Sequence, residues 1–316
     1  MIEMLVKSSG SSADQAETLK LNKLISLEGL DSIKVTCPSC LRSGFLVSFW
    51  VKKVDPKPWY VGHRDRNETS WCRLDPPERI QLQNQKFINK RIVKKFIRQA
   101  RPFVLFSGGR DSSCALSYVK KIAEQMGKEV TAIFVDTTAS LPEITQYAKE
   151  MSKTIDVKLE IVRPKTDFFT LAKRKGIPRI KSRWCCEFLK IRPIKEYLEK
   201  ICEPKVVFDG IRAEESRVRR NYLPLWYHPA FRCISISPIF YWSHRKVDAY
   251  LRKWDLPPSP LKSLAFSAEC WCGAYAKRSD FEKLLEIHPD IYGKLEEVEK
   301  TRNFSFIYDY GKGKRF

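Results

Sequence analysis

The sequence predicts an α/β protein whose parallel sheet is flanked by helices, with a small β-rich module before it and a helical region after it. Three observations support this fold class. Short apolar runs alternate with amphipathic segments over residues 103–262, which is typical of strands joined by crossover helices. Over residues 31–78, aromatic and β-branched residues are interrupted by Pro and Gly, and over residues 263–316 the apolar spacing is mostly helical.

Composition indicates a globular protein with a polyanionic partner. The chain has 316 residues, 43% of them hydrophobic, and no run of eighteen apolar residues; it can therefore build a core, and no membrane span is expected. Its start lacks the apolar region of a signal peptide, so we expect a soluble, cytoplasmic protein. Lys and Arg outnumber Asp and Glu by 58 to 37, a net charge of +21. Nucleic acid is the favoured partner, and a generally basic proteome or crowded phosphate chemistry is the alternative.

Residues 1–102 divide into three expected parts. Residues 1–30 are polar and form a flexible tail. Residues 31–78 form a small β module that needs support beyond its own core. Residues 79–102 combine regularly spaced apolar residues with many Lys and Arg, which predicts a basic connecting helix.

The β module carries a candidate zinc site. Cys37 and Cys40 have the spacing at which zinc-ribbon sites begin, and His63 and Cys72 would complete a Cys₃His set. The alternative for His63 is an exposed loop histidine. Aromatic residues around these positions are interpreted first as core, and second as surfaces on which unpaired bases could stack.

Strands and helices then alternate. The apolar runs FVLF, VTAIFV, VKLEIV and KVVF predict strands, and the first three are followed by amphipathic segments that predict helices. Ligands of open parallel sheets bind at the carboxyl ends of the strands, so the turns after these strands are the place to look for a site.

The first of these turns is polar and rich in small residues, reading 107-SGGRDSS-113. Glycines let backbone N–H groups approach phosphate oxygens, and serine hydroxyls add donors. The arginine can pair with phosphate, and the aspartate can cap the helix or help to hold magnesium. A generic tight turn with a helix cap is the alternative. The candidate phosphate-binding residues are Ser107, Gly108, Gly109, Ser112 and Ser113, and the candidate catalytic residues are Arg110 and Asp111.

This stretch resembles the SGGxDS loop of PP-loop ATP pyrophosphatases, members of the HUP-like (adenine nucleotide alpha hydrolase-like) superfamily. Four later stretches resemble, in order, the phosphoadenosine phosphosulfate (PAPS) reductase-like family within that superfamily: 133-IFVDTTASLPEI-144, 183-RWCCEFLKIRPI-194, 210-GIRAEESRVRR-220 and 237-SPIFYWSHRKVDAYLRKWDLPPSPL-261. The resemblance implies that the loop holds the phosphates of ATP with magnesium and that cleavage falls between the α- and β-phosphates. It also implies that Asp136 lies near the nucleotide. Arg212 and Arg217 are expected to meet phosphate or nucleic acid rather than form a solvated charge run.

Two cysteine pairs suggest a second centre. Cys185 and Cys186 are adjacent, and Cys270 and Cys272 flank one Trp. Without a signal peptide the thiols are expected to stay reduced, so metal binding is favoured over disulfides. Zinc is a competitor, whereas the family resemblance implies a [4Fe-4S] cluster bound by Cys-Cys and Cys-x-x-Cys pairs. The second pair here is Cys-x-Cys, so the sequence does not decide whether three or all four thiols bind the cluster.

Three functions follow. The first is an ATP pyrophosphatase that adenylates a nucleic acid, tRNA or DNA, and then delivers sulfur from a donor protein through the cluster. The second is a PAPS reductase-type oxidoreductase acting on a sulfonucleotide. Those reductases carry a nucleophilic cysteine near the C-terminus, and no cysteine follows Cys272 in this sequence. The third is a nucleic-acid-binding protein without catalysis, since a fold does not guarantee activity.

Overall fold

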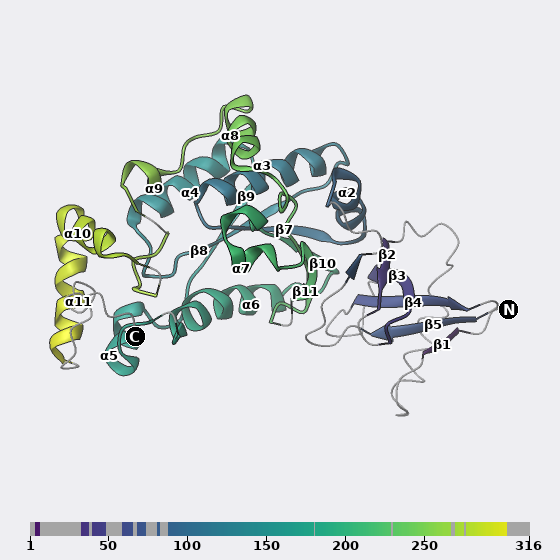
Figure 1. Ribbon diagram of the computed structural model, residues 1–316, viewed down its shortest axis with the longest axis horizontal. Coiled ribbons are helices and arrows are strands. Elements are labelled where there is room, and N and C mark those ends of the chain that lie inside the picture. Colours follow the sequence, from purple (N-terminus) through teal and green to yellow (C-terminus); the bar gives the residue numbers. More distant parts are fainter. Residues whose placement is uncertain are drawn as a thin grey trace. The chain divides into compact units, whose positions relative to one another are not determined.

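The computed structural model describes residues 4–6, 33–37, 40–48, 59–65, 68–73, 81–82 and 88–301, the last range without residues 180, 229, 267, 268 and 275 (Figure 1). The chain divides into two compact units. The first unit comprises Met1–Val104, Ala115–Val130 and Glu199–Lys246, and the second comprises Leu105–Cys114, Thr131–Leu198 and Val247–Phe316.

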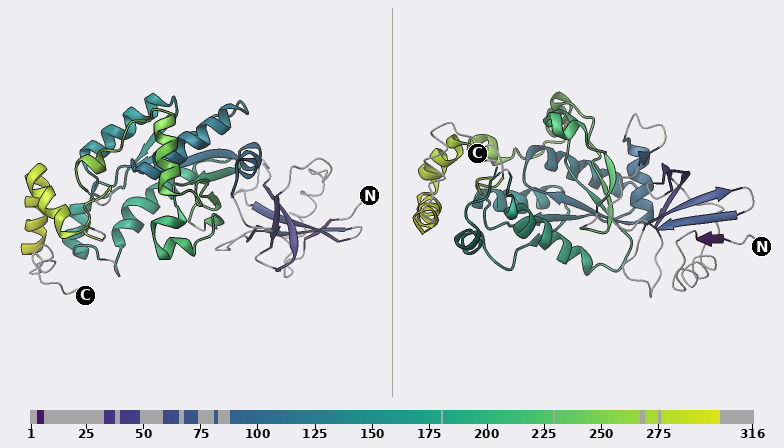
Figure 2. Two further views of the ribbon diagram at one scale, coloured as in Figure 1. Left: turned by 45° about the horizontal axis from the view of Figure 1, so that its top comes forward. Right: turned by 60° about the horizontal axis from the view of Figure 1, so that its bottom comes forward.

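The N-terminal sheet belongs to the first unit. Its strand order is β1-β5-β4-β3-β2-β6, and every neighbouring pair is antiparallel except β1 with β5. β4 and β5, labelled in Figure 1, are the two long antiparallel strands that the right view of Figure 2 shows apart from the others. The strands are β1 (Met4–Val6), β2 (Ile33–Thr36), β3 (Ser43–Ser48), β4 (Trp59–Asp65), β5 (Glu68–Arg73) and β6 (Gln81–Leu82).

The second sheet is mostly parallel and has the strand order β11-β12-β10-β7-β8-β9. β10 pairs in parallel with β7 and with β12, β8 pairs in parallel with β9, and β11 runs antiparallel to β12. Every residue of β8, β10 and β12 is buried, as expected for strands covered on both faces. The strands are β7 (Arg101–Phe106), β8 (Thr131–Val135), β9 (Lys158–Val162), β10 (Lys205–Phe208), β11 (Leu225–His228) and β12 (Cys233–Ile236).

Helices flank this sheet (Figure 1). None of the helices in the described ranges is long and apolar enough to cross a membrane. The α-helices are α2 (Lys90–Gln99), α3 (Arg110–Glu124), α4 (Pro142–Thr154), α5 (Phe168–Lys175), α6 (Arg192–Glu199), α7 (Arg217–Arg220), α8 (His244–Lys253), α9 (Pro260–Ser263), α10 (Arg278–Ile287) and α11 (Pro289–Thr301); η1 (Cys186–Ile191) is a π-helix and η2 (Ala213–Glu215) is a 3₁₀-helix.

The predicted α/β class with a parallel sheet is confirmed, whereas the predicted start of the connecting helix is wrong. The connecting helix begins at Lys90 rather than near residue 79, because Gln81 and Leu82 pair with β2 as a strand and Asn89 caps the helix by accepting a hydrogen bond from the Ile92 N–H. The C-terminal region is helical as predicted and forms two helices, the second of which begins at Pro289, a residue that can begin a helix but cannot continue one. Most of residues 1–30 and all of 302–316 lie outside the described residues.

Candidate nucleotide site and cysteine centres

The predicted phosphate loop connects β7 to α3. Gly108 has φ +76°, and a Cβ at this position would lie 2.6 Å from Cγ2 of Ile144. Both the backbone conformation and the close approach of α4 therefore require glycine. At Gly109 an added Cβ would meet its nearest neighbour, Ser107 Oγ, at an ordinary 3.5 Å. Among the described residues there is therefore room for a Cβ at Gly109, and packing does not require glycine at this position.

The serine hydroxyls hold the loop in shape. The Ser112 hydroxyl donates to the Gly109 carbonyl at 2.8 Å and accepts from the Ser107 N–H at 3.3 Å. Ser113 donates to the same carbonyl at 3.0 Å and is almost fully buried. These contacts preorganise the turn, so that less ordering remains when an anion binds. The structure brings together all five residues predicted for phosphate binding, whereas their contact with a nucleotide stays a prediction.

The two candidate catalytic residues are in contact. Nε of Arg110 lies 3.0 Å from a carboxylate oxygen of Asp111, and its Nη1 lies 3.4 Å from Asp248 in α8. Two carboxylates beside a phosphate loop offer the hard oxygen ligands that magnesium prefers. The donor set therefore fits magnesium together with a nucleotide phosphate. The sequence analysis did not identify Asp248, because no local pattern connects it with residues 107–113.

Sequence analysis also missed two residues that brace the loop. The Tyr147 hydroxyl donates to the Pro257 carbonyl at 2.8 Å and lies 2.9 Å from the Ser113 hydroxyl. Burial raises the pKa of Tyr147, which keeps the phenol protonated as a donor. Ser259 donates to the Gly108 carbonyl at 2.6 Å. The Pro-rich segment around residue 258 thus stabilises the glycine turn, through Ser259 directly and through Tyr147 indirectly.

Asp136 lies at the end of β8, as predicted. Its carboxylate accepts the Thr138 N–H at 3.1 Å and lies 2.8 Å from the guanidinium of Arg163. Thr138 has φ +56°, a conformation uncommon outside glycine. The Asp136 carboxylate stabilises this tight turn, and its proximity to adenosine remains a prediction.

The four cysteines predicted to share one centre form a chain of pairwise contacts in the second unit, but their sulfur atoms do not all lie within 4.8 Å of one another. The thiols of Cys185 and Cys272 lie 3.5 Å apart, and those of Cys270 and Cys272 lie 3.6 Å apart. Cys186 begins the π-helix η1, and a hydrogen bond from Cys185 lowers the pKa of the Cys186 thiol. An all-thiol set suits either an iron–sulfur cluster or zinc.

The sulfur separations bear on the choice of metal. In a tetrahedral zinc site with Zn–S bonds of about 2.3 Å, every pair of ligand sulfurs lies about 3.8 Å apart; two pairs here come close to that value, but the sulfur atoms of the whole set are not all within 4.8 Å of one another. A cluster with several irons requires wider spacing, so the thiols would move apart to hold it. One buried donor at this centre lacks a hydrogen-bond acceptor. It is Nε1 of Trp271, the residue between Cys270 and Cys272, which has no partner in the described part of the chain. Hydrogen bonds to the sulfurs are one way in which proteins tune iron–sulfur clusters.

Aromatic rings and one ion pair surround the thiols. Trp271 stacks on Phe169 and meets Phe168 edge to face, while Trp184, directly before Cys185, stacks on Phe168. Cys185 and Cys272 are buried, whereas Cys186 and Cys270 remain partly exposed. Lys190, also on η1, lies 2.7 Å from Glu269, whose charge raises the Lys190 pKa. A permanently charged ammonium therefore lies on the π-helix that begins at Cys186.

The N-terminal cysteines and histidine also meet. The ligand atoms of Cys37, Cys40, His63 and Cys72 all lie within 4.8 Å of one another. Nε2 of His63 is 3.3 Å from the Cys40 sulfur, and its Nδ1 is 2.8 Å from the Ser43 carbonyl. The second contact places the proton on Nδ1 and leaves Nε2 free to bind a metal.

Local packing explains this arrangement. His63 lies on β4 and Cys72 on the neighbouring strand β5. A Cβ on Gly44 would come within 2.8 Å of Nδ1 of His63, so glycine lets the imidazole approach β3. A hydrogen bond with Cys72 lowers the pKa of Cys37, which favours a thiolate ligand. The set fits the predicted Cys₃His zinc site in donor type and spacing.

The two predicted arginines are placed differently from each other. Arg212 is fully buried, and its guanidinium donates to the Trp242 carbonyl at 3.0 Å and lies 3.2 Å from Glu214. It therefore braces the first unit and does not present its charge at the surface. Arg217 is exposed on α7 and forms no ion pair with a carboxylate in the described ranges. Only the second of the two is open to phosphate in this conformation.

Comparison with known proteins identifies the family. The model of the phosphoadenosine phosphosulfate reductase domain matches residues 101–268. The chain belongs to this family. Similar curated proteins include the uncharacterized protein MJ0066 of Methanocaldococcus jannaschii, 29% identical over 66% of this chain and 43% of that protein, and an adenosine 5'-phosphosulfate reductase of Bacillus cereus, 25% identical over 46% of this chain and 62% of that enzyme. The chain spans about half the length of the relatives it matches.

Two solved structures show weaker similarity. A PAPS reductase from Candida auris aligns with a TM-score of 0.43 at 19% identity, covering 57% of this chain and 88% of that one. An FMN adenylyltransferase from Candida glabrata aligns with a TM-score of 0.40 at 14% identity, covering 54% of each chain. The family assignment rests on the domain match.

Proposed function

We propose that this family member is a PP-loop ATP pyrophosphatase that adenylates a nucleic acid and couples this step to sulfur transfer, as in tRNA thiolation or DNA phosphorothioation. The observation that carries the proposal is the complete 107-SGGRDSS-113 loop at a strand-to-helix turn, held in shape by its own serines. A backbone arranged in this way is suited to binding polyphosphate before any reaction begins.

The proposed first step is nucleotidyl transfer. An oxygen of the nucleic acid attacks the α-phosphorus of ATP and forms a new P–O bond, while the bond from the α-phosphorus to the bridging oxygen breaks and pyrophosphate leaves. Loop N–H groups and Arg110 would stabilise the developing phosphate charge. Asp111 and Asp248 would hold magnesium on the pyrophosphate oxygens.

The proposed second step takes place near the cysteine centre. Cys185, Cys186, Cys270 and Cys272 would hold a [4Fe-4S] cluster through three or four thiolates; when bound, such a cluster supplies iron that can carry a sulfur atom from a donor protein. Sulfur from the donor protein, at the oxidation level of sulfide, would form a bond to the adenylated atom of the nucleic acid, while the bond from that atom to the oxygen shared with AMP breaks and AMP leaves. All ten cysteines are free thiols. This suits the reducing cytoplasm as the site of action.

Nucleic acid as the acceptor is supported by charge and by the N-terminal module. The net charge of +21 favours a polyanion, and Arg217 offers an exposed guanidinium. In this proposal zinc at Cys37, Cys40, His63 and Cys72 stabilises the small module, whose core alone is too small. The module then serves as a docking element for the acceptor.

The second candidate is reduction of a sulfonucleotide. It is favoured by the similarity to proteins named adenosine 5'-phosphosulfate reductase. A reductase would bind its sulfonucleotide through the same loop without cleaving ATP, so the two functions differ in their products.

The test uses anaerobically purified protein with ATP and magnesium, with tRNA, with DNA or with neither, followed by separation of AMP, ADP and pyrophosphate. We expect AMP and pyrophosphate, stimulated by one nucleic acid and reduced at least about 100-fold by Asp111→Asn. Asp290→Asn is the matched control, since Asp290 lies in the first turn of α11 and is distant in sequence from the loop. Absence of AMP with every acceptor, together with reduction of a sulfonucleotide, would establish the second candidate.

A further inference from the structure

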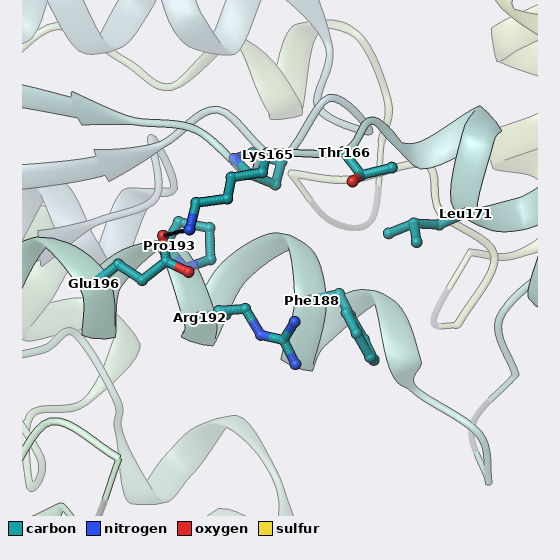
Figure 3. A pocket seen from close by; sticks show the side chains of 8 residues that line it. Lys165, Thr166, Leu171, Phe188, Arg192, Pro193 and Glu196 are labelled. Atoms are coloured by element: carbon teal, nitrogen blue, oxygen red, sulfur yellow. Dashed lines mark ion pairs between the residues drawn. The ribbon is translucent and has the colours of Figure 1, made fainter.

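A small cavity of about 200 Å³ lies within the second unit (Figure 3). Its walls come from the segment after β9, from α5, from the π-helix η1 and from α6. Phe188, Arg192 and Pro193 of its lining fall in the family-like stretch 183–194, but sequence analysis predicted no ligand contact for any lining residue. The lining residues are Pro164, Lys165, Thr166, Leu171, Phe188, Arg192, Pro193 and Glu196.

The lining combines an apolar wall with hydrogen-bond donors. Phe188 and Leu171 supply the apolar part, and Arg192 reaches toward Phe188 along one side (Figure 3). Thr166 adds a hydroxyl. The lining has a single carboxylate, that of Glu196, which Lys165 neutralises at 3.2 Å. Around the cavity, positive charge is therefore in excess over negative charge.

Two cations converge on the ring of Phe188. The guanidinium carbon of Arg192 lies 4.3 Å from the ring centroid, and Nζ of Lys175 lies 4.7 Å from it. Neither cation forms an ion pair with a carboxylate in the described part of the chain. An aromatic ring compensates only a small part of a charge, about 0.5–1 kcal/mol at exposed sites. Both cations thus remain available to an anion.

The surroundings are also strongly basic. Residues 163–200 hold twelve Lys or Arg and four Asp or Glu, so an eighth of the chain carries more than a third of the net positive charge. Arg192, Lys175 and Lys165 are all exposed. A field of this kind attracts a polyanion rather than a neutral ligand.

The size of the cavity narrows the ligand. Sites for free small molecules usually enclose about 300–1,000 Å³, more than this cavity offers. One base or one phosphoribosyl group of a longer chain fits, with the rest of the polymer outside. The combination of a flat apolar wall, a planar guanidinium and neighbouring ammonium groups is how proteins hold unpaired nucleotides.

We propose that this cavity binds one unpaired nucleotide of the nucleic-acid substrate, with its base against Phe188 and the guanidinium of Arg192, and its phosphate near Lys175. This deepens the proposed function and rests on it, because it assumes a nucleic-acid acceptor. Cys186 and Phe188 share the π-helix η1, and π-helical turns occur frequently at functional sites. A nucleotide bound here would lie close to the cysteine centre, where the proposed sulfur transfer takes place.

The test measures binding of fluorescein-labelled single-stranded oligonucleotides by the full chain, using anisotropy over a series of salt concentrations. The probes are an RNA and a DNA of matched sequence, so that the tighter one identifies the source of the nucleotide. The variants are Arg192→Gln, Lys175→Gln and Phe188→Leu. Arg174→Gln is the matched control, since Arg174 is an exposed neighbour on α5 that does not line the cavity.

We expect Arg192→Gln and Lys175→Gln each to weaken binding about 3–10-fold and to reduce the slope of log K against log salt by about one. Phe188→Leu keeps an apolar side chain and removes the flat ring, so it should weaken binding about tenfold. Arg174→Gln should change the affinity less than about twofold, because long-range attraction alone is screened by salt. Both cation variants alter exposed side chains and should leave the fold intact.

Two outcomes would overturn the proposal. In the first, the wild type binds an oligonucleotide but the variants of Arg192, Phe188 and Lys175, of which the last contacts Phe188 without lining the cavity, bind it as tightly as Arg174→Gln; the cavity assignment then fails while nucleic-acid-stimulated AMP formation still stands. In the second, polyglutamate competes as well as the oligonucleotide, which would make the cavity a site for an acidic protein. If neither probe binds the wild type and no nucleic acid stimulates AMP formation, the cavity assignment and the proposed function fail together.

Discussion

Replacing Gly108 by alanine should destabilise the second unit, because two independent costs meet at this residue. Its φ of +76° is unfavourable for any residue with a Cβ, by about 1–2 kcal/mol. The new Cβ would also lie 2.6 Å from Cγ2 of Ile144, and relieving such an overlap in a packed region costs about 1–3 kcal/mol. Reduced freedom of the unfolded chain returns about 0.4–1 kcal/mol. The net loss in the free energy of unfolding is about 2–4 kcal/mol.

The assay compares thermal unfolding of Gly108→Ala and Gly109→Ala. A loss of about 2–4 kcal/mol corresponds to a lower Tm by about 5–15 °C for a domain of this size. Gly109→Ala adds the same atom one residue later, where the nearest side-chain atom is 3.5 Å away, so its Tm should change by less than about 3 °C.

Activity provides the complementary readout. The Cβ of Gly109→Ala would occupy space at the loop backbone, where phosphate is expected to approach, and so ATP cleavage should fall although the protein stays folded. Equal Tm values for the two variants would refute the packing argument for Gly108. Wild-type ATP cleavage by Gly109→Ala would refute the assignment of phosphate to this turn.

Further predictions concern the metal sites, the loop brace and one buried histidine. Cys72→Ser should remove zinc and leave iron, whereas Cys272→Ser should remove iron and leave zinc, as measured by elemental analysis; Cys202→Ser, at an exposed thiol, should change neither. Tyr147→Phe removes the hydroxyl that joins Ser113 to the Pro257 carbonyl, so unfolding should be easier by about 1 kcal/mol and KM for ATP should rise. Burial lowers the pKa of His228 to about 4, and the unfolded chain binds this proton first as the pH falls below about 6.5. Stability should therefore decline between pH 6.5 and 4, by at most about 1.4 kcal/mol per pH unit, and His228→Gln should flatten this dependence in urea titrations.

The features that sequence could predict are those in which a short stretch carries its own chemistry. Small residues and hydroxyls directly after an apolar run predicted the phosphate loop, and the spacing of Cys37 and Cys40 predicted a zinc-ribbon start. The meeting of Cys185 with Cys272, 87 positions apart, depended on resemblance to a family, because no local rule connects such distant residues. His63 was one of only four histidines, which made it a candidate before its contacts were known.

The features that sequence could not predict depend on tertiary contacts. Arg212 looked like a phosphate ligand among neighbouring arginines, yet it is fully buried and bound to a backbone carbonyl; charge alone does not distinguish a structural arginine from a binding one. Asp248 and Tyr147 reach the loop from helices that follow it in the chain. The π-helix η1 adds a wider turn to a helical segment, and hydrophobic periodicity has no signal for a single such turn.

The turn after β8 connects the candidate nucleotide site with the cysteine centre. Asp136 begins this turn, and Ser140 near its end forms a strand bridge with Cys270, while the Trp271 N–H donates to the Ala139 carbonyl at 3.0 Å. Thr138 holds the middle of the same turn in place, since its hydroxyl accepts a hydrogen bond from the Phe168 N–H at 2.8 Å. Because these contacts hold one short segment at both ends, a ligand that displaced Asp136 would also displace the backbone of the cysteine pair. In the proposed reaction, such a connection would make sulfur delivery responsive to the nucleotide, and the iron centre of Asp136→Asn should then differ spectroscopically from that of the wild type even without ATP.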